Sequence, residues 1–162
     1  MRRNTAKGFS IVELLVAMGI FSLLFGFIWL NLLGSRGRAS QSSTIDVFTS
    51  DLRAMQLKAM KGDSEGRVDT DAYGVLLKTT TYTLFHGSTY NPDDPSNRTV
   101  SLGDGESFNS VLFPGNSIVF AKGSGELVNY DPAQSSVSLT NMQSNTQKTL
   151  QLNKYGVITS SN

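Results

Sequence analysis

The sequence has 162 residues, of which 39% are hydrophobic, and its 14 basic and 13 acidic side chains give a formal net charge of +1. This length suits one domain plus one long helix, and the balanced charge provides no strong positive field of the kind that polyanion binding needs. Cysteine is absent, which excludes a disulfide, a cysteine-ligated zinc site and a thiol nucleophile.

Residues 7–33, KGFSIVELLVAMGIFSLLFGFIWLNLL, are apolar almost throughout and contain a single carboxylate, that of Glu13. Roughly 20 apolar residues cross a bilayer as a helix, so we predict a hydrophobic, membrane-spanning helix over 9–33. A carboxylate within such a segment is costly, less so near its end, and indicates a functional role. Glu13 therefore needs a positively charged partner, and no Lys or Arg lies between it and Arg36.

Two plainer interpretations of this amino terminus are a cleaved signal peptide and an uncleaved signal anchor. The basic start at Arg2 and Arg3 fits both. A signal peptide has a shorter apolar region and a small-residue cleavage site, whereas this run is longer and continues into a polar helical pattern. A signal anchor fits the length but explains neither Glu13 nor the junction between Gly8 and Phe9.

The segment KGFSIVELLVAMGI resembles the class III signal of type IV prepilins and pseudopilins. In that family a short basic leader ends in Gly, here Gly8, the next residue is usually Phe, here Phe9, and a Glu stands fifth in the mature chain, here Glu13. The resemblance implies that residues 1–8 are a leader, which a membrane-embedded prepilin peptidase removes before methylating the new terminus at Phe9. It also implies that Glu13 serves filament assembly.

Loss of the leader would shift the charge balance. Residues 1–8 hold three of the 14 basic residues, so a chain that begins at Phe9 has 11 basic and 13 acidic residues and a net charge of −2. Beyond Leu33 the counts are 11 basic and 12 acidic. This balance argues against nucleic acid as a partner. The basic leader itself favours an orientation with the amino terminus on the cytoplasmic side.

We expect the helix to continue past the membrane as an amphipathic segment over 34–61. This region has no proline, and five apolar residues recur at spacings of three and four, which places them in one stripe on a helix that packs against a sheet. Gly62 is the predicted cap at the end of the helix. The stripe consists of Ile45, Phe48, Leu52, Met55 and Ala59.

Residues 62–162 are predicted to form a β-rich globular domain, beginning with a polar loop over 62–72. Short runs of β-branched, aromatic and aliphatic residues, separated by Gly-rich or polar breaks, predict an antiparallel sheet. One long helix followed by several strands indicates an α+β fold. The predicted strands are 73–78 and 81–86, paired as a hairpin, then 99–102, 111–113, 117–122, 136–141, 147–152 and 156–159.

This half of the chain resembles the GspH/FimT-type minor pseudopilins and minor pilins, through three segments. These are SDLRAMQLKAM in the helix, SIVFAKGSGEL, in which a strand ends at Gly123, and the closing QKTLQLNKYGVIT. They are patterns of hydrophobic residues and glycines and contain no catalytic signature. The resemblance implies a minor subunit with a pilin-like arrangement of helix and sheet.

The sequence offers little catalytic chemistry. His86 is the only histidine, and the motifs of α/β-hydrolases, P-loop proteins and zinc proteases are absent. Two acidic loops contain oxygen ligands of the type that calcium prefers, but neither matches an EF-hand, and we interpret them as solvated loops. We therefore expect no enzyme activity, no cofactor and no metal. The acidic residues are Asp63, Glu65, Asp69 and Asp71 in the first loop and Asp93 and Asp94 in the second.

These observations together predict a structural subunit of a type IV pilus or of a type II secretion pseudopilus. Its expected partners are prepilin peptidase, other pilin or pseudopilin subunits and the inner membrane, with the β domain on the extracytoplasmic side. Two alternatives remain open at this stage. One is a DNA-binding minor pilin used in DNA uptake, and the other is a signal-anchored β domain that never polymerises.

Overall fold

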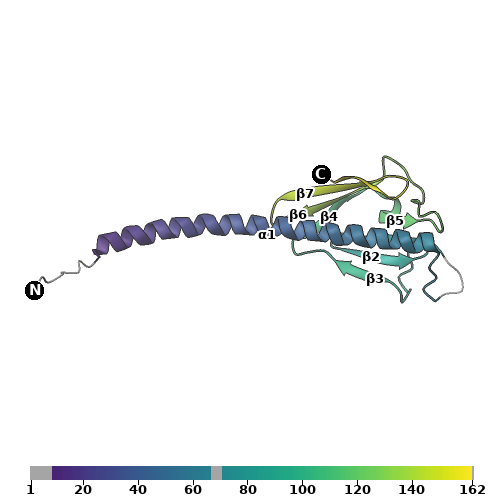
Figure 1. Ribbon diagram of the computed structural model, residues 1–162, viewed down its shortest axis with the longest axis horizontal. Coiled ribbons are helices and arrows are strands. Elements are labelled where there is room, and N and C mark those ends of the chain that lie inside the picture. The colour runs from purple at the N-terminus through teal and green to yellow at the C-terminus, as the bar shows by residue number, and fades with distance from the viewer. Residues whose placement is uncertain (1–8, 67–70, 162) are drawn as a thin grey trace, which may run out of the picture.

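The computed structural model describes residues 9–66 and 71–161, as one long helix followed by eight strands. The fold is α+β, as the sequence predicted, and the amino-terminal half of the helix projects from the globular part (Figure 1). The elements are α1 (Ile11–Lys61), β1 (Tyr73–Leu77), β2 (Thr81–His86), β3 (Arg98–Ser101), β4 (Glu106–Val111), the 3-10 turn η1 (Pro114–Asn116), β5 (Ser117–Phe120), β6 (Ser136–Asn141), β7 (Thr146–Leu152) and β8 (Ile158–Ser161).

Helix α1 is continuous over 51 residues, which corresponds to a length of roughly 75 Å at 1.5 Å per residue. It ends where the sequence predicted, at Gly62, whose left-handed backbone (φ 64°, ψ 41°) is accessible to glycine without steric cost. The Gly62 amide donates to the Ala59 carbonyl at 3.3 Å, and the Asp63 amide donates to the Lys58 carbonyl at 3.1 Å. These two bonds form a Schellman motif, which satisfies carbonyls that the helix end would otherwise leave unpaired.

The strands form two four-stranded antiparallel sheets, where the sequence had suggested one. In the first sheet the order is β3-β2-β1-β5, and β1 and β2 form the predicted hairpin, with Tyr73 opposite His86 and Leu77 opposite Tyr82. In the second sheet the order is β4-β6-β7-β8. Strands β2 and β6 have the predicted bounds, and the other strands overlap their predicted positions, β4 only at Val111.

The predicted strand over 111–113 is wrong, because the strand at this place is β4, which ends at Val111. Its sequence, ESFNSV, is mostly polar, so the alternation that marks a half-buried strand is hidden. Glu106 and Phe108 are its buried residues, and Glu106 is polar, so an apolar pattern is missing at the start of the strand. Phe113 is buried as well, but it follows the strand and precedes η1.

The predicted helix stripe forms the centre of the hydrophobic core. All five of its members are buried, and α1 runs along both sheets (Figure 1). Phe48 links the two sheets, since its ring lies 5.1 Å from that of Tyr82 in the first sheet and 5.5 Å from that of Phe108 in the second. One side chain of the helix therefore holds the two halves of the β domain to a common core.

Gln41 extends the stripe by one turn toward the amino terminus, yet it is polar and only 1% exposed. Its side-chain amide donates to the carbonyls of Leu139 at 3.0 Å and Thr146 at 3.3 Å, and its oxygen accepts from the Thr146 hydroxyl at 2.8 Å. These bonds satisfy a buried amide and tie the helix to β6 and β7 at the point where it leaves the domain. The apolar periodicity in the sequence gave no sign of this contact.

A second polar contact joins the helix to the first sheet. The hydroxyl of the buried Tyr82 donates to the Asp51 carboxylate at 2.7 Å, and the Arg98 guanidinium lies 3.5 Å from the same carboxylate. Burial raises the pKa of the Tyr82 hydroxyl far above its ordinary value of about 10, and the hydrogen bond to Asp51 raises it further. Tyr82 therefore remains a neutral donor across the physiological pH range.

Candidate assembly site at the amino-terminal end of the helix

The first turn of α1 is fixed by a side-chain cap that the sequence interpretation overlooked. Ser10 precedes the helix with an extended backbone (φ −80°, ψ 152°), and its hydroxyl accepts the amide of Glu13 at 3.2 Å. The Ser10 carbonyl accepts the amide of Leu14 at 3.1 Å. A Ser followed three residues later by a Glu is the sequence signature of a capping box, so this helix start was readable from the SIVE segment.

The predicted cleavage junction lies just before this cap. Phe9 precedes Ser10 outside the helix, and its side chain is 85% exposed. Gly8 and the rest of the predicted leader lie outside the described residues. Phe9 precedes the helix in the uncleaved chain, so Phe9 and Glu13 do not share a helix face here.

Glu13 occupies the third position of the helix and is exposed. Its carboxylate is favourably placed relative to the helix dipole, because acidic groups in the first turn lie near the partial positive charge of the unpaired amides. Among the described residues it forms no ion pair. Its neighbours along the helix are apolar, so a partner molecule that covered them would also enclose this carboxylate.

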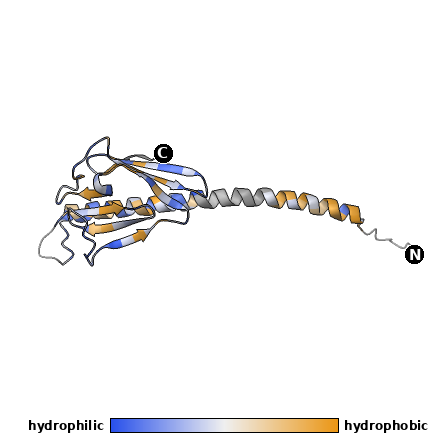
Figure 2. Cartoon of the chain, turned by 180° about the vertical axis from the view of Figure 1, so that it is seen from behind, coloured by the Kyte–Doolittle hydropathy of each residue, from blue (hydrophilic) through white to orange (hydrophobic). Residues whose placement is uncertain are grey.

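The apolar side chains that follow Glu13 are exposed around the whole helix. Between residues 11 and 26 every large apolar side chain is more than half exposed, and none contacts the β domain, from which this half of α1 projects (Figure 2). Contiguous apolar surface of this size marks an interaction site with protein or lipid. The side chains are Ile11, Val12, Leu14, Leu15, Val16, Met18, Ile20, Phe21, Leu23, Leu24 and Phe25.

The predicted membrane span over 9–33 is described only in part. Residues 27–33 belong to the helix, but their side chains lie outside the described ones. Within the described part of the chain, no helix combines the length and the apolar character needed to cross a membrane.

The other polar candidates do not converge on a site in the described ranges 9–66 and 71–161. No three His, Asp or Glu side chains in these ranges come close enough together to hold a metal ion. Asp69 lies outside the described residues. In the second acidic loop, Asp94 accepts from the amide and hydroxyl of Ser96, and the Asn91 side chain accepts from the amide of Asp93. These are local turn contacts.

His86 lies at the end of β2, where its ring packs edge-on against Tyr73 with the centroids 4.9 Å apart. Its Nε2 atom is buried and has no hydrogen-bond partner among the described residues. The edge-on contact with Tyr73 gives His86 a packing role.

Comparison with known families identifies the amino-terminal segment. Residues 3–29 match the sequence profile described as the prokaryotic N-terminal methylation motif. The match covers most of the predicted leader, the junction at Phe9, Glu13 and the exposed apolar stretch. No curated protein and no solved structure matches the chain. The motif supports a type IV pilin-like prepilin that a peptidase processes, while the β domain has no matched relative.

Proposed function

We propose that this chain is a prepilin-like structural subunit of a type IV pilus or of a type II secretion pseudopilus. The observation that carries the proposal is that the family motif and the exposed apolar half of the helix occupy the same residues. The methylation motif over residues 3–29 coincides with the half of α1 whose apolar side chains are exposed, while the other half of the same helix holds the β domain. A subunit that polymerises through its helix and displays its domain needs this division.

In the proposed pathway the precursor is held in the inner membrane by its apolar helix, and prepilin peptidase cleaves it between Gly8 and Phe9. Methylation of the Phe9 amine follows. The helix then packs against those of other pilin or pseudopilin subunits, and burial of a large apolar side chain contributes about 1.5–3 kcal/mol. The β domain remains on the extracytoplasmic side and needs no cofactor for this role.

Glu13 is proposed to set the register of assembly. In an apolar filament core its carboxylate must be paired, because an isolated buried charge is far more costly than a paired one. Cleavage creates a positive group at Phe9, and the partner we propose is the Phe9 amine of a neighbouring subunit. The exposed carboxylate, the exposed Phe9 and the apolar surroundings in the isolated chain support this pairing.

A minor subunit of the GspH/FimT type is the finer proposal, and it rests on the three segments of hydrophobic residues and glycines noted above. The charge balance beyond Leu33, 11 basic against 12 acidic residues, supports a structural role over DNA uptake. A tight, salt-sensitive complex of the chain with duplex DNA would instead favour the DNA-binding alternative.

The experiment that tests this proposal is mass spectrometry of the amino terminus of the protein isolated from membranes. We expect a chain that begins with N-methylated Phe9. Replacing Gly8 by Leu should leave the precursor uncut, because glycine lets the peptidase approach the backbone closely, whereas Asn4→Ala in the leader should be processed normally. An intact Met1 would favour the signal-anchored alternative, and cleavage beyond Leu33 would favour a signal peptide.

A further inference from the structure

The outer face of the first sheet, opposite α1, carries a patch of apolar residues. Antiparallel sheets with one face on the core alternate apolar and polar residues along each strand. Here the outward positions of three neighbouring strands include Gly74 and Leu76 in β1, Phe85 in β2 and Val119 in β5, beside the polar Thr83 and Ser117. Gly74 is required at its position, since a Cβ there would lie 2.3 Å from the Phe85 ring.

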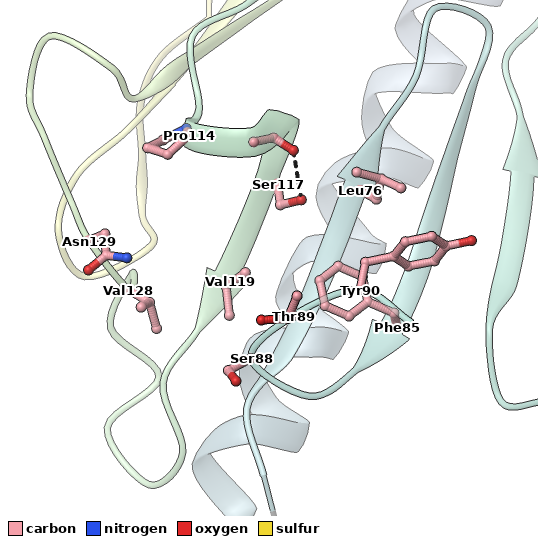
Figure 3. A pocket seen from close by; sticks show the side chains of 11 residues that line it. Leu76, Phe85, Ser88, Thr89, Tyr90, Pro114, Ser117, Val119, Val128 and Asn129 are labelled. Atoms are coloured by element: carbon pink, nitrogen blue, oxygen red, sulfur yellow. Dashed lines mark hydrogen bonds between the residues drawn. The ribbon is translucent and has the colours of Figure 1, made fainter. Parts of the chain in front are cut away.

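Three surrounding segments turn this apolar face into a cavity of about 390 Å³, which lies within the usual range for small-molecule sites (Figure 3). The segments are the loop after β2, the turn η1, and the loop after β5. The groove, as we call it, is lined by Leu76, Phe85, Ser88, Thr89, Tyr90, Pro114, Gly115, Ser117, Val119, Val128 and Asn129.

The polar groups of the groove are uncharged and available. No Asp, Glu, Lys, Arg or His is among its lining residues. The side chains of Ser88, Thr89, Tyr90 and Asn129 form no hydrogen bond with any described residue, whereas the Ser117 hydroxyl donates to the Gly115 carbonyl at 3.1 Å. Donors and acceptors therefore stand at the rim, above an apolar floor closed on one side by the Phe85 and Tyr90 rings, whose centroids are 5.6 Å apart.

This lining argues against two classes of ligand. A charged ligand would lose hydration without gaining a countercharge, which is unfavourable. A peptide that adds as a strand needs a free sheet edge. The edge of β5 beside the groove is already occupied, because the Val128 amide donates to the Val119 carbonyl at 2.8 Å and Phe120 forms a bridge with Leu127.

We propose that the groove binds a neutral saccharide. A pyranose ring has an apolar face of C–H groups and a periphery of hydroxyls, which matches the apolar floor and the uncharged hydroxyl and amide groups of the rim. The site is separate from the proposed processing and assembly segment, since none of its residues belongs to α1. A subunit displayed on a filament would present this groove outward to glycans.

The test is a titration of sugars into the full chain, which is held in phosphocholine micelles and carries labelled Leu and Val methyl groups. Nuclear magnetic resonance monitors the methyl signals. Detergents with sugar headgroups are avoided because they would compete. The probes are lactose, cellotriose and maltotriose, with glucose as a single ring and trigalacturonate as a charged comparison. We expect a neutral sugar to shift the methyl resonances of Leu76, Val119 and Val128, and trigalacturonate to leave them unchanged. Tighter binding of a trisaccharide than of glucose indicates a glycan chain as the natural source; equal binding indicates a free sugar.

Two variants locate the binding in the groove. Val119→Glu should weaken binding at least tenfold, while the same substitution at Val157, which is 56% exposed in the turn before β8, should leave it unchanged. Asn129→Asp keeps the shape of an exposed side chain at a residue with φ 54°, which Asp tolerates, and should also weaken binding. The proposal is overturned if no neutral sugar shifts these resonances at about 20 mM, well above a millimolar Kd. It is equally overturned if trigalacturonate binds as well as the neutral sugars, or if both groove variants bind like the parent.

Discussion

The two halves of α1 share one continuous helical backbone but differ in which of their apolar side chains are buried. Residues 41–59 bury one stripe of side chains against two sheets and leave the opposite face exposed, whereas residues 11–26 expose apolar side chains all around. Residues 11–26 need a covering from outside the chain, whereas residues 41–59 contribute to the core of the domain. The segment that stabilises the domain is therefore separate from the segment proposed for assembly, and substitutions in the two halves should have separable consequences.

The largest contrast is expected from one substitution made in both halves. Phe48→Ala removes a ring that is 2% exposed and contacts both sheets, so the free energy of unfolding should fall by about 3–5 kcal/mol. Phe21→Ala removes a ring that is 61% exposed, and should change it by less than about 0.5 kcal/mol. Denaturant titration of the full chain in micelles, followed by a β-domain signal, measures both. Equal losses would abolish the distinction between the halves.

A smaller loss is expected at the boundary between the halves, where Gln41 fastens the helix to the second sheet. Gln41→Leu keeps a similar volume but leaves two carbonyls and the Thr146 hydroxyl without this partner, which should cost about 1–3 kcal/mol. Asp46→Ala, on the exposed face of the same helix, is the control and should have little effect. If Gln41→Leu were neutral or stabilising, the amide would be dispensable for anchoring the helix.

The end of the helix provides a backbone test of the domain half. Gly62→Ala places a Cβ on a left-handed residue with φ 64° and should cost roughly 1–2 kcal/mol. Gly66→Ala, in the following loop at φ 83°, is the matched control, because it also places a Cβ on a residue with positive φ but does not end a helix. A loss of helical circular dichroism confined to Gly62→Ala would indicate that the Schellman motif holds the last turn.

The smallest effect concerns pH. The pKa of Tyr82 is raised in the folded chain, so its contribution to stability is complete below about pH 10, the unfolded value, and is lost as pH rises toward the folded value. The unfolding free energy of the parent should therefore fall more steeply between about pH 10 and 11 than that of Tyr82→Phe. Tyr155→Phe, at a ring that is 62% exposed, should follow the parent. Identical slopes for the parent and Tyr82→Phe would contradict this role.

The sequence predicted the elements that rest on apolar periodicity. The stripe from Ile45 to Ala59 and the hairpin of β1 and β2 follow simple periods of burial, and both were confirmed. Strand β4 was misplaced because polar residues, among them the buried Glu106, occupy most of its length. The split into two sheets was not foreseen, since strand spacing along a chain does not determine which strands pair.

The two candidate sites also differ in how far each could be predicted from the sequence. The proposed processing and assembly segment was predicted from a local signal, with the basic leader, Gly8, Phe9, Glu13 and the apolar run adjacent in sequence. The groove was missed because its lining comes from three separated segments, and its members are ordinary loop and strand residues. Only the fold brings Tyr90 and Asn129 to the two sides of Val119 (Figure 3).

The central claim is that the exposed half of α1 is an assembly surface whose register Glu13 sets, and one measurement tests it most directly. The amounts of the parent, Glu13→Gln and Glu13→Leu are compared in sheared filaments and in total membrane protein. Glu126→Leu, a substitution of a carboxylate in the β domain, is the control. The account predicts that both Glu13 variants are inserted and cleaved like the parent but are largely missing from filaments, while the control is incorporated normally. Incorporation of cleaved Glu13→Leu at the level of the parent would contradict it.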